Sequence, residues 1–463
     1  MRKEKDFLGE VELPDSAYYG IHTQRAYDNF GDIRETVDPV FIRSYLQVKK
    51  ACSLTNKELG YLDPGKADYI LSAIEDLLQN KDYRDIIINP LCGGAGTSVN
   101  MNINEVIANK ACEKAGRARA DHDFIHPLDH VNMHQSTNDT FPTALKVAVL
   151  LYLERLEENL VRLQDELQKK EKEYAGIIKL GRTELQDALP VTVGMQFSAY
   201  SEAIARDRWR IFKARERIKL VNLGGTAIGT GFNAPQRYIF RVIEVLKELT
   251  GLNIARGENL LDITQNMDSL AEVSGLIKTI AVNLLKISED LRVLSSGPEG
   301  GFHEISLPRL QEGSTIMPGK VNPVILEFVS QNSLLVIHQD AALSTAAGLG
   351  NLELNQFIPL IAYLLLRNLK IINLSIEKLD GKVIRGLQLN KERIERNFHG
   401  SMALLTYLSQ YIGHDKAGEI YQQALKTGKP IRQLLSESGA LTEERLSELL
   451  SPERIRMMGI KNE

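Results

Sequence analysis

The sequence predicts a mainly α-helical protein whose centre is a bundle of long helices. Apolar residues across Val149–Leu167 recur in alternating steps of four and three, and the same spacing returns across Val273–Leu294. This is the period of long helices packed side by side. Two more apolar stretches, at about 324–343 and 359–379, also favour helix. Strand-like alternation is rare and is clearest near 174–180.

A solitary coiled coil is the alternative interpretation of this spacing. The apolar face is wider than the seam of a two-stranded coiled coil, and glycine-rich loops interrupt the helical stretches, so a bundle is favoured. We place domain boundaries near Thr137 and Leu389. They predict an N-terminal domain over 1–137, a central long-helix bundle over 138–389 and a small C-terminal helical domain over 390–463.

Composition limits the classes of function. At 463 residues the chain is long enough for more than one domain. Its 56 basic and 60 acidic side chains leave a net charge of -4 without a basic stripe, which argues against nucleic-acid and anionic-membrane partners. We find no leader segment and no apolar run of bilayer length, and Cys52, Cys92 and Cys112 lack the close spacing of a disulfide or zinc framework. We therefore expect a soluble, cytoplasmic protein.

The segment Gly313–Pro323 is the strongest candidate for an active-site loop. It combines a hydroxyl, a cation and an amide with glycines that let the backbone bend and prolines that stiffen it. The apolar run that follows predicts a helix start, whose N–H groups would favour an anion together with Lys320. Ser314 is therefore a candidate base, and Lys320 and Asn322 are candidate carboxylate ligands. The alternative is a surface turn with a solvated lysine.

Two other patterns suggest ligands but have simpler interpretations. The glycine cluster at 224–231 lacks the lysine of a P-loop and follows no clear strand, so a tight connection between helices is favoured over a phosphate cradle. Histidines spaced every four residues would align as metal ligands on one helix face, and these are His122, His126, His130 and His134. Pro127 interrupts that run. We therefore expect neither a metal nor another cofactor.

The Gly313–Pro323 segment resembles the flexible serine loop of the fumarase/aspartase superfamily. Members of this superfamily eliminate ammonia, water or another group across the Cα–Cβ bond of a carboxylic acid, which gives an alkene such as fumarate. Three further blocks match in the family's order, and shorter matches extend the similarity over essentially the whole chain: Gly93–Asn102, His130–Asp139, Gly181–Ala188, Tyr18–Thr23 and Ile412–His414. The resemblance, which is strongest to aspartases, implies a three-domain fold with a central helical bundle.

The resemblance also implies roles for the polar residues of these blocks. The family surrounds the carboxylate that carries the intermediate's charge with hydroxyl donors, and the matching residues here are Thr97, Ser98, Ser136, Thr137 and Thr315. Donors in a site closed to water stabilise such charge with little reorganisation. Lys320 and Asn322 would hold the second carboxylate with help from Thr183, and Asn138 would contact the amine. Each hydroxyl taken singly is also compatible with a helix cap or a turn.

Glu184 departs from the family pattern. Fumarases and some aspartases resemble each other in having histidine at this position, and other aspartases have glutamine. A carboxylate would repel a substrate carboxylate and attract a cationic amine, so Glu184 favours a nitrogen leaving group over water. Glu327 matches the acidic partner of the family's histidine, and the two glutamates would share a proton if they meet. Alternatively, Glu184 points away or pairs with Arg182 or Lys320. Glu299, where the family usually has arginine, is a further departure.

These observations predict a carbon–nitrogen lyase that eliminates ammonia from L-aspartate to give fumarate. The alternatives within the superfamily are release of a bulkier amine, from a betaine or an N-substituted aspartate, and hydration of fumarate. An alternative from another class is a helical relative that has lost catalysis and serves as a structural protein. The resemblance also implies a homotetramer whose active sites each draw on three subunits, and long apolar helix faces favour association.

Overall fold

The chain folds mainly into helices, as the heptad spacing predicted. The computed structural model describes residues 1–31, 33, 35–457 and 459. The helices, of which η1 and η2 are π-helical, are α1 (Ile21–Phe30), α2 (Pro39–Glu58), α3 (Pro64–Asn80), α4 (Thr97–Lys114), η1 (Pro127–Val131), α5 (Thr137–Glu173), α6 (Val193–Ile218), α7 (Gln236–Thr250), α8 (Leu260–Gln265), α9 (Asp268–Leu294), α10 (Val324–Gly348), α11 (Ile358–Leu379), η2 (Asp380–Ile384), α12 (Lys391–Gly400), α13 (Ala403–Ile412), α14 (His414–Thr427), α15 (Ile431–Glu437), α16 (Glu443–Leu449) and α17 (Pro452–Arg456).

The strands form short two-stranded sheets. Three pairs are antiparallel and the pair of β5 with β6 is parallel: β1 (Arg2–Asp6) with β2 (Gly9–Leu13), β3 (Ile178–Thr183) with β4 (Gln186–Thr192), β5 (Leu220–Val221) with β6 (Ala255–Arg256), and β7 (Ile305–Ser306) with β8 (Gln388–Leu389). The strand expected near 174–180 corresponds to β3. The sheets therefore connect helices and do not form a core layer.

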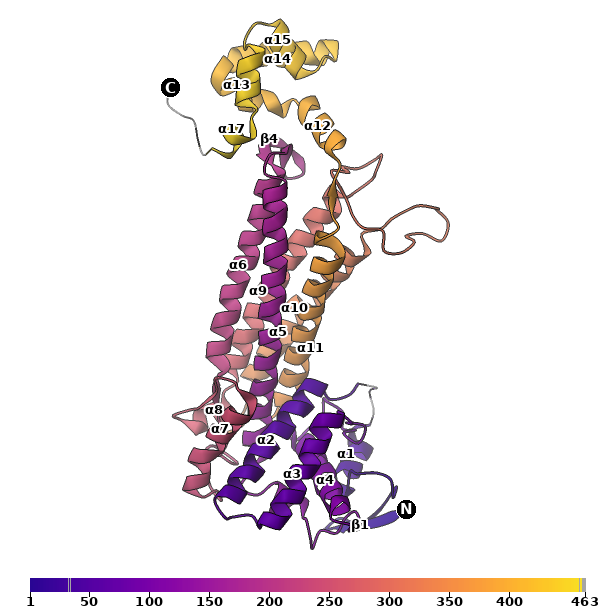
Figure 1. Cartoon of the computed structure of the whole chain (residues 1–463), viewed down its shortest axis with the longest axis vertical. Coiled ribbons are helices and arrows are strands. Elements are labelled where there is room, and N and C mark those ends of the chain that lie inside the picture. The colour runs from indigo at the N-terminus through magenta and orange to yellow at the C-terminus, as the bar shows by residue number, and fades with distance from the viewer. Residues whose placement is uncertain (32, 34, 458, 460–463) are drawn as a thin grey trace. The chain divides into compact units, whose positions relative to one another are not determined.

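Five long helices, α5, α6, α9, α10 and α11, are the main elements of the chain (Figure 1). The two heptad segments lie within α5 and α9, and α10 starts directly after the Gly313–Pro323 segment, as predicted. The apolar spacing did not predict α6, because its apolar positions are interspersed with many charged residues.

The chain divides into two compact units. Unit one comprises Met1–Glu157, Arg210–Thr279 and Leu335–Asn373. Unit two comprises Glu158–Trp209, Ile280–Leu334 and Leu374–Glu463. Each long helix therefore contributes residues to both units. The three domains predicted from boundaries near Thr137 and Leu389 stay a prediction.

In unit one the heptad positions are core positions. Val149 and Leu153 on α5 have no exposed surface. Polar contacts join the neighbouring helices, because Ser274 Oγ of α9 donates to Asp340 of α10 at 2.7 Å. Lys278 Nζ donates to the same carboxylate at 2.6 Å. The buried carboxylate of Asp340 thus has a hydrogen-bond donor for each of its two oxygens.

In unit two the helix segments make similar contacts. Asn283 Nδ2 of α9 donates to Asp207 of α6 at 2.9 Å, and Ser330 Oγ of α10 donates to Glu289 of α9 at 2.6 Å. The C-terminal helices have their own apolar cluster, which includes Phe398, Leu404, Leu408, Ile420, Leu434, Leu435 and Leu446. The expectation of helices at this end of the chain is confirmed.

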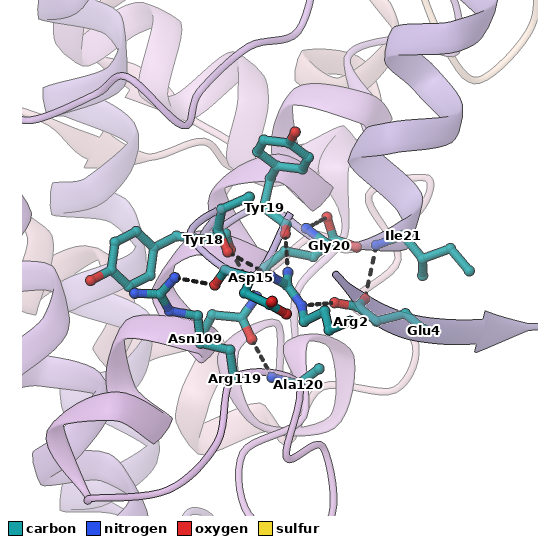
Figure 2. A network of polar contacts seen from close by, with 12 residues as sticks. Arg2, Glu4, Asp15, Tyr18, Tyr19, Gly20, Ile21, Asn109, Arg119 and Ala120 are labelled. Carbon is teal, nitrogen blue, oxygen red and sulfur yellow. Dashed lines mark hydrogen bonds and ion pairs between the residues drawn. The ribbon is translucent and has the colours of Figure 1, made fainter. Parts of the chain in front are cut away.

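The N-terminal hairpin is fastened to the loop that precedes α1 (Figure 2). The guanidinium of Arg2 donates to Glu4 Oε1 at 2.8 Å and to three backbone carbonyls, those of Pro14, Ala17 and Tyr19. Glu4 in turn accepts the backbone N–H of Ile21, the first residue of α1, at 2.9 Å. A carboxylate at a helix N-terminus is favourable because it satisfies an unpaired N–H group and opposes the helix dipole.

One helical stretch, Ile358–Ile384, is long and apolar enough to cross a membrane by length and composition. The stretch is not a continuous apolar run, because charged residues such as Arg367 and Lys370 interrupt it. Within the fold, 67% of its most apolar window is buried, which is the environment of a core helix.

Candidate active site

The predicted site residues fall in both compact units. Unit one contains Thr97, Ser98, Ser136, Thr137 and Asn138. Unit two contains Thr183, Glu184, Ser314, Thr315, Lys320, Asn322 and Glu327. Hydrogen bonds join the two blocks of unit one. In unit two, across the residues that the structure describes, no hydrogen bond or ion pair joins Thr183 or Glu184 to the Gly313–Pro323 loop.

The Gly93–Asn102 block enters helix α4 at Gly96. The φ angle of Gly96 is +86°, and a Cβ there would lie 2.3 Å from Cδ2 of Phe141, so a larger residue does not fit. Thr97 begins the helix in an exposed position, and Ser98 is half-buried. Both hydroxyls therefore lie at a helix N-terminus, where an anionic group is favoured.

The second block forms the start of helix α5, and the buried carboxylate of Asp139 holds it in place. Asp139 Oδ1 accepts the N–H of Ser136 at 3.0 Å, and Oδ2 accepts those of Gly224 and Thr226 at 3.1 and 3.0 Å. Burial raises the pKa of Asp139 to about 6, against the opposing effect of these hydrogen bonds. The N–H groups of the 224–231 loop thus bind this side chain, which is not the arrangement of a phosphate cradle.

Asn138 is fixed through its backbone and its side chain. Pro142 has no N–H, so the carbonyl of Asn138, four residues earlier in α5, lacks a helical donor. Asn222 Nδ2 donates to that carbonyl at 2.9 Å. Asn138 Nδ2 donates to the carbonyl of Ala227 at 2.7 Å. The side-chain contact uses a donor of the Asn138 amide and not its oxygen.

A buried amide network connects the two blocks of unit one. Asn100 Nδ2 of α4 donates to Thr137 Oγ1 at 3.0 Å and to Asn132 Oδ1 at 3.2 Å. The same Asn132 oxygen accepts Asn104 Nδ2 at 3.2 Å and Lys49 Nζ at 2.9 Å. Lys49 has no exposed surface, and burial lowers its pKa to about 7. A series of hydrogen bonds therefore connects Thr137 to the buried side chain of Lys49.

Sequence reasoning missed this network. A single lysine in an amphipathic helix such as α2 is normally solvated, and nothing local marks Lys49 as buried. The available signal was the asparagine run of α4, because Asn100, Asn102 and Asn104 are all buried in the helix. Asparagine is a poor helix former, so repeated asparagine inside a helix indicates specific hydrogen bonding.

In unit two, Thr183 and Glu184 lie at the tip of the β3–β4 hairpin. Thr183 pairs with Gln186, so Glu184 and Leu185 form a two-residue turn. Their φ angles are +54° and +62°, a conformation that favours glycine or asparagine. Both side chains are exposed and line a cavity of about 850 Å³. Backbone strain of this kind concentrates at functional sites.

Glu304 anchors the base of this hairpin. Its carboxylate accepts Arg182 Nη2 at 2.6 Å and lies 2.9 Å from Lys179 Nζ. Asn397 Nδ2 donates to it at 3.2 Å. Burial raises the pKa of Glu304, but the hydrogen bond from Arg182 and the charge of Lys179 outweigh burial, so the pKa is lowered. Arg182 thus pairs with Glu304, and the alternative in which it pairs with Glu184 is not what the structure has.

The Gly313–Pro323 segment closes on itself as a loop. The N–H of Gly313 donates to the carbonyl of Lys320 at 3.0 Å, and Asn322 Nδ2 donates to the carbonyl of Gly313 at 2.6 Å. Lys320 and Thr315 are exposed, and Asn322 is half-buried. The side-chain amide of Asn322 therefore holds the loop in addition to any contact with a substrate.

Ser314 Oγ lies among backbone donors in this loop. It accepts the N–H of Ile316 at 3.2 Å and that of Met317 at 3.0 Å. Such donors stabilise negative charge on the oxygen and so favour its ionised form. We expected the donors to come from the start of the following helix, but α10 begins only at Val324. The donors belong to the loop itself, because its turn directs two successive N–H groups toward Ser314.

Glu327 lies in the first turn of α10. Its Oε1 is 4.0 Å from Arg292 Nη2. No hydrogen bond or ion pair joins it to Glu184 within the described ranges of this chain. Proton sharing between Glu184 and Glu327 stays a prediction.

The histidine run does not form a metal site in the described part of the chain. Pro127 starts the π-helix η1, and the ring nitrogens have separate partners. His130 Nδ1 accepts the N–H of His126 at 2.8 Å, its Nε2 lies 3.0 Å from Lys66 Nζ, and His134 Nδ1 lies 2.8 Å from Asn56 Oδ1. Among the described residues no group of three or more His, Cys, Asp or Glu is arranged to hold a metal ion.

Known proteins are similar to this chain in sequence and in fold. The family described as Lyase matches residues 9–337, and the family described as Fumarase C C-terminus matches residues 404–457. An aspartate ammonia-lyase from Bacillus sp. is 42% identical over 99% of this chain and 98% of its own length. One from Helicobacter pylori is 43% identical over 98% of each.

Solved structures agree with these matches. A fumarate lyase:delta crystallin from Brucella melitensis superposes with a TM-score of 0.93 at 39% identity, over 99% of this chain and all (100%) of that one. A class II fumarase from Schistosoma mansoni has a TM-score of 0.90 at 32% identity, over 97% and 98%. The chain belongs to the lyase family that includes the fumarases and aspartate ammonia-lyases.

Proposed function

We propose that the protein is a carbon–nitrogen lyase that eliminates ammonia from L-aspartate to give fumarate. Family membership supports the class of reaction, and full-length relatives at about 40% identity bear the name aspartate ammonia-lyase. The structural observation that carries the proposal is the environment of Ser314, whose Oγ accepts two backbone N–H groups at 3.2 and 3.0 Å. An alkoxide stabilised in this way is a base strong enough for carbon acid chemistry.

The reaction is difficult because the C–H group beside a carboxylate is a very weak acid. In the proposed mechanism, Ser314 Oγ takes the Cβ proton and the C–H electron pair moves onto the adjacent carboxylate oxygens. Donors stabilise these oxygens, and the residues proposed for this role are Thr97, Ser98, Ser136, Thr137 and Thr315. The electron pair then forms the Cα–Cβ double bond while the C–N pair leaves with nitrogen. The departing ammonia takes the proton from Ser314.

The remaining groups of the substrate need their own partners. We propose that Lys320, Asn322 and Thr183 hold the second carboxylate. Asn138 and Glu184 bind the ammonium, with Glu327 supporting Glu184. A carboxylate in an exposed turn attracts a cationic leaving group and repels an anion, so hydration of fumarate is the less favoured activity.

A related lyase that releases a bulkier amine is the second candidate. The observation that favours it is the cavity of about 850 Å³ beside Glu184, which exceeds the size of an ammonium ion. A panel of cationic amino acids, N-substituted aspartates and betaines, screened for alkene absorbance, separates the two candidates. Faster turnover of a bulkier amine than of L-aspartate would favour the second.

The direct test measures fumarate formation by ultraviolet absorbance. We expect turnover of L-aspartate by the wild type and its loss in Ser314→Ala, because the proposed base is removed. Gln311→Ala is the matched control, since Gln311 is an exposed residue two positions before the same loop. Turnover of malate without aspartate would refute the ammonia-lyase assignment. Inactivity on every amino and hydroxy acid tested would favour a structural role.

We propose further that the protein is a cytoplasmic homotetramer with shared active sites. Large apolar side chains on the long helices are exposed in the single chain, among them Val282 at 48%, Leu335 at 37% and Leu374 at 40%. Burial of such side chains favours association. Sedimentation should give a tetramer, and mixing Ser314→Ala with Thr137→Val, each far less active than wild type, should raise the activity above that of either variant alone. A stable, active monomer would contradict the proposal.

A further inference from the structure

Lys49 is a buried cation for which the proposed mechanism has no role. It lies on α2 with no exposed surface, and the main effect of burial is to disfavour its charged form. Its ammonium donates to Asn132 Oδ1 and to Gln135 Oε1, both at 2.9 Å. Burial of a charged lysine costs free energy of folding, so a buried lysine is a candidate for a functional role, which its contacts indicate.

The contacts of Lys49 indicate which atoms donate and which accept in the hydrogen bonds between Lys49 and Thr137. The ammonium form of lysine can only donate, and Asn132 Nδ2 donates to the carbonyl of Gln135 at 3.2 Å, so the group of Asn132 that faces Lys49 is the side-chain oxygen. That oxygen also accepts from Asn100 Nδ2 and Asn104 Nδ2, both at 3.2 Å. The NH₂ group of Asn100 therefore faces the network, and its other hydrogen reaches Thr137 Oγ1 at 3.0 Å. Thr137 is the acceptor in this contact, and its own hydroxyl proton is left for another partner.

The opposite arrangement of the same amides would pair two acceptors that the observed arrangement leaves unpaired. In the observed arrangement the side-chain oxygens of Asn100 and Asn104 are buried without a hydrogen-bond partner in the described structure. If Asn132 were rotated, its NH₂ group would donate to those oxygens, and Thr137 would then donate its proton to Asn100. Lys49 opposes this rotation because the NH₂ group of Asn132 would meet a second donor, and the rotation would also break the hydrogen bond from Asn132 Nδ2 to the carbonyl of Gln135 at 3.2 Å. Lys49 thus contributes to the orientation that frees the Thr137 proton.

We propose that Lys49 is a positioning residue that acts through Asn132 and Asn100 to make Thr137 a hydrogen-bond donor toward the substrate carboxylate. The inference rests on the proposed function, in which the Thr137 hydroxyl binds the carboxylate that gains negative charge. A donor preorganised for that charge contributes mainly in the transition state. Lys49 therefore acts on kcat, although it does not touch the substrate.

The first test is Lys49→Met, which keeps an unbranched side chain as far as Cε and removes the ammonium donors. We expect kcat for L-aspartate to fall about 10- to 100-fold with little change in KM, as for loss of one hydrogen bond to developing charge. Tyr45→Phe is the matched control. It removes a buried hydrogen bond from α2 to Thr140, at 2.9 Å, and leaves the hydrogen bonds between Lys49 and Thr137 in place. Its kcat should stay within about twofold of wild type.

A double-mutant cycle separates positioning from a general structural role. If Lys49 acts through the Thr137 proton, Lys49→Met should have little further effect on kcat in a Thr137→Val background. Multiplicative losses in the double variant would overturn the proposal. Fumarate formation by the wild type is measured in the same experiment, so that failure of the proposed function can be distinguished from failure of the role proposed for Lys49. A wild type without aspartate turnover refutes the proposed function, whereas an active wild type with multiplicative losses refutes only the role of Lys49.

Two aspartate substitutions test the direction of the network if Lys49→Met does not fold. Asn132→Asp keeps an acceptor toward Lys49 and Asn100, so the direction is retained. Asn100→Asp places an acceptor against Thr137 Oγ1, so Thr137 must donate to it. Both variants add the same charge to the same network, and Asn100→Asp should lose at least about tenfold more kcat than Asn132→Asp. Equal losses would contradict the proposal.

Discussion

Replacing Glu304 with glutamine is expected to destabilise the protein by about 3–5 kcal/mol, the usual effect of breaking a buried ion pair. The Glu304 side chain is 2% exposed, and its partners Lys179 and Arg182 are 7% and 11% exposed. Glutamine keeps the shape of the side chain but removes its charge. Two largely buried cations, at 2.9 and 2.6 Å, would then lack a counter-charge. The hairpin that carries Glu184 would lose its anchor.

The assay is urea unfolding followed by circular dichroism at a fixed protein concentration, because association contributes to stability. Glu299→Gln, at an exposed position of the preceding loop, is the control and should lie within about 0.5 kcal/mol of wild type. Lys179→Met should partly restore the stability of Glu304→Gln, since it removes one uncompensated cation. A Glu304→Gln protein within about 1 kcal/mol of wild type would refute the reasoning.

The dependence of stability on acid pH provides an independent test of the Glu304 carboxylate. The pKa of Glu304 in the folded protein lies below its ordinary value of 4.5, because Arg182 and Lys179 outweigh the effect of burial. Its stabilising contribution is therefore present above pH 4.5 and is lost as the pH falls through the folded value. Glu304→Gln should lose less stability than wild type on acidification over that range. An equal loss in both proteins would show that Glu304 does not carry this pH dependence.

The remaining predictions concern the hairpin turn and another buried lysine. Leu185→Gly should raise the thermal midpoint, because relief of a left-handed leucine contributes about 1 kcal/mol, and a lowered midpoint would contradict the strain argument. Glu184→Gln should lower kcat/KM for L-aspartate about tenfold to a hundredfold, and unchanged kinetics would make Glu184 structural. Burial lowers the pKa of Lys146 from 10.5 to about 8, so the unfolded chain binds more protons and stability rises with pH between these values. Lys146→Met should flatten that rise in urea unfolding, and an unchanged slope would exclude Lys146 as its source.

The sequence by itself determined the fold class and the position of the candidate active-site loop. Heptad spacing predicted the helices that became α5 and α9, since core positions of a bundle must repeat with the helix period. Glycine, proline and polar side chains identified Gly313–Pro323 because turn chemistry is local. Resemblance to a lyase family is confirmed by the matches, and the roles assigned to individual site residues stay predictions. The charged surface of α6 obscured its helix period, and that helix was missed.

Only the tertiary structure decided which polar groups are paired and in which direction their hydrogen bonds run. Arg182 and Glu304 are 122 positions apart in sequence, and Asn100 and Thr137 are 37 apart. No local pattern couples residues at such separations, because each side chain is equally compatible with solvent until the helices and hairpin bring its partner within about 3 Å. Once these groups are buried, every unpaired donor or acceptor costs free energy of folding. The partners of Lys49 and Glu304 therefore matter to stability and to the arrangement of the site.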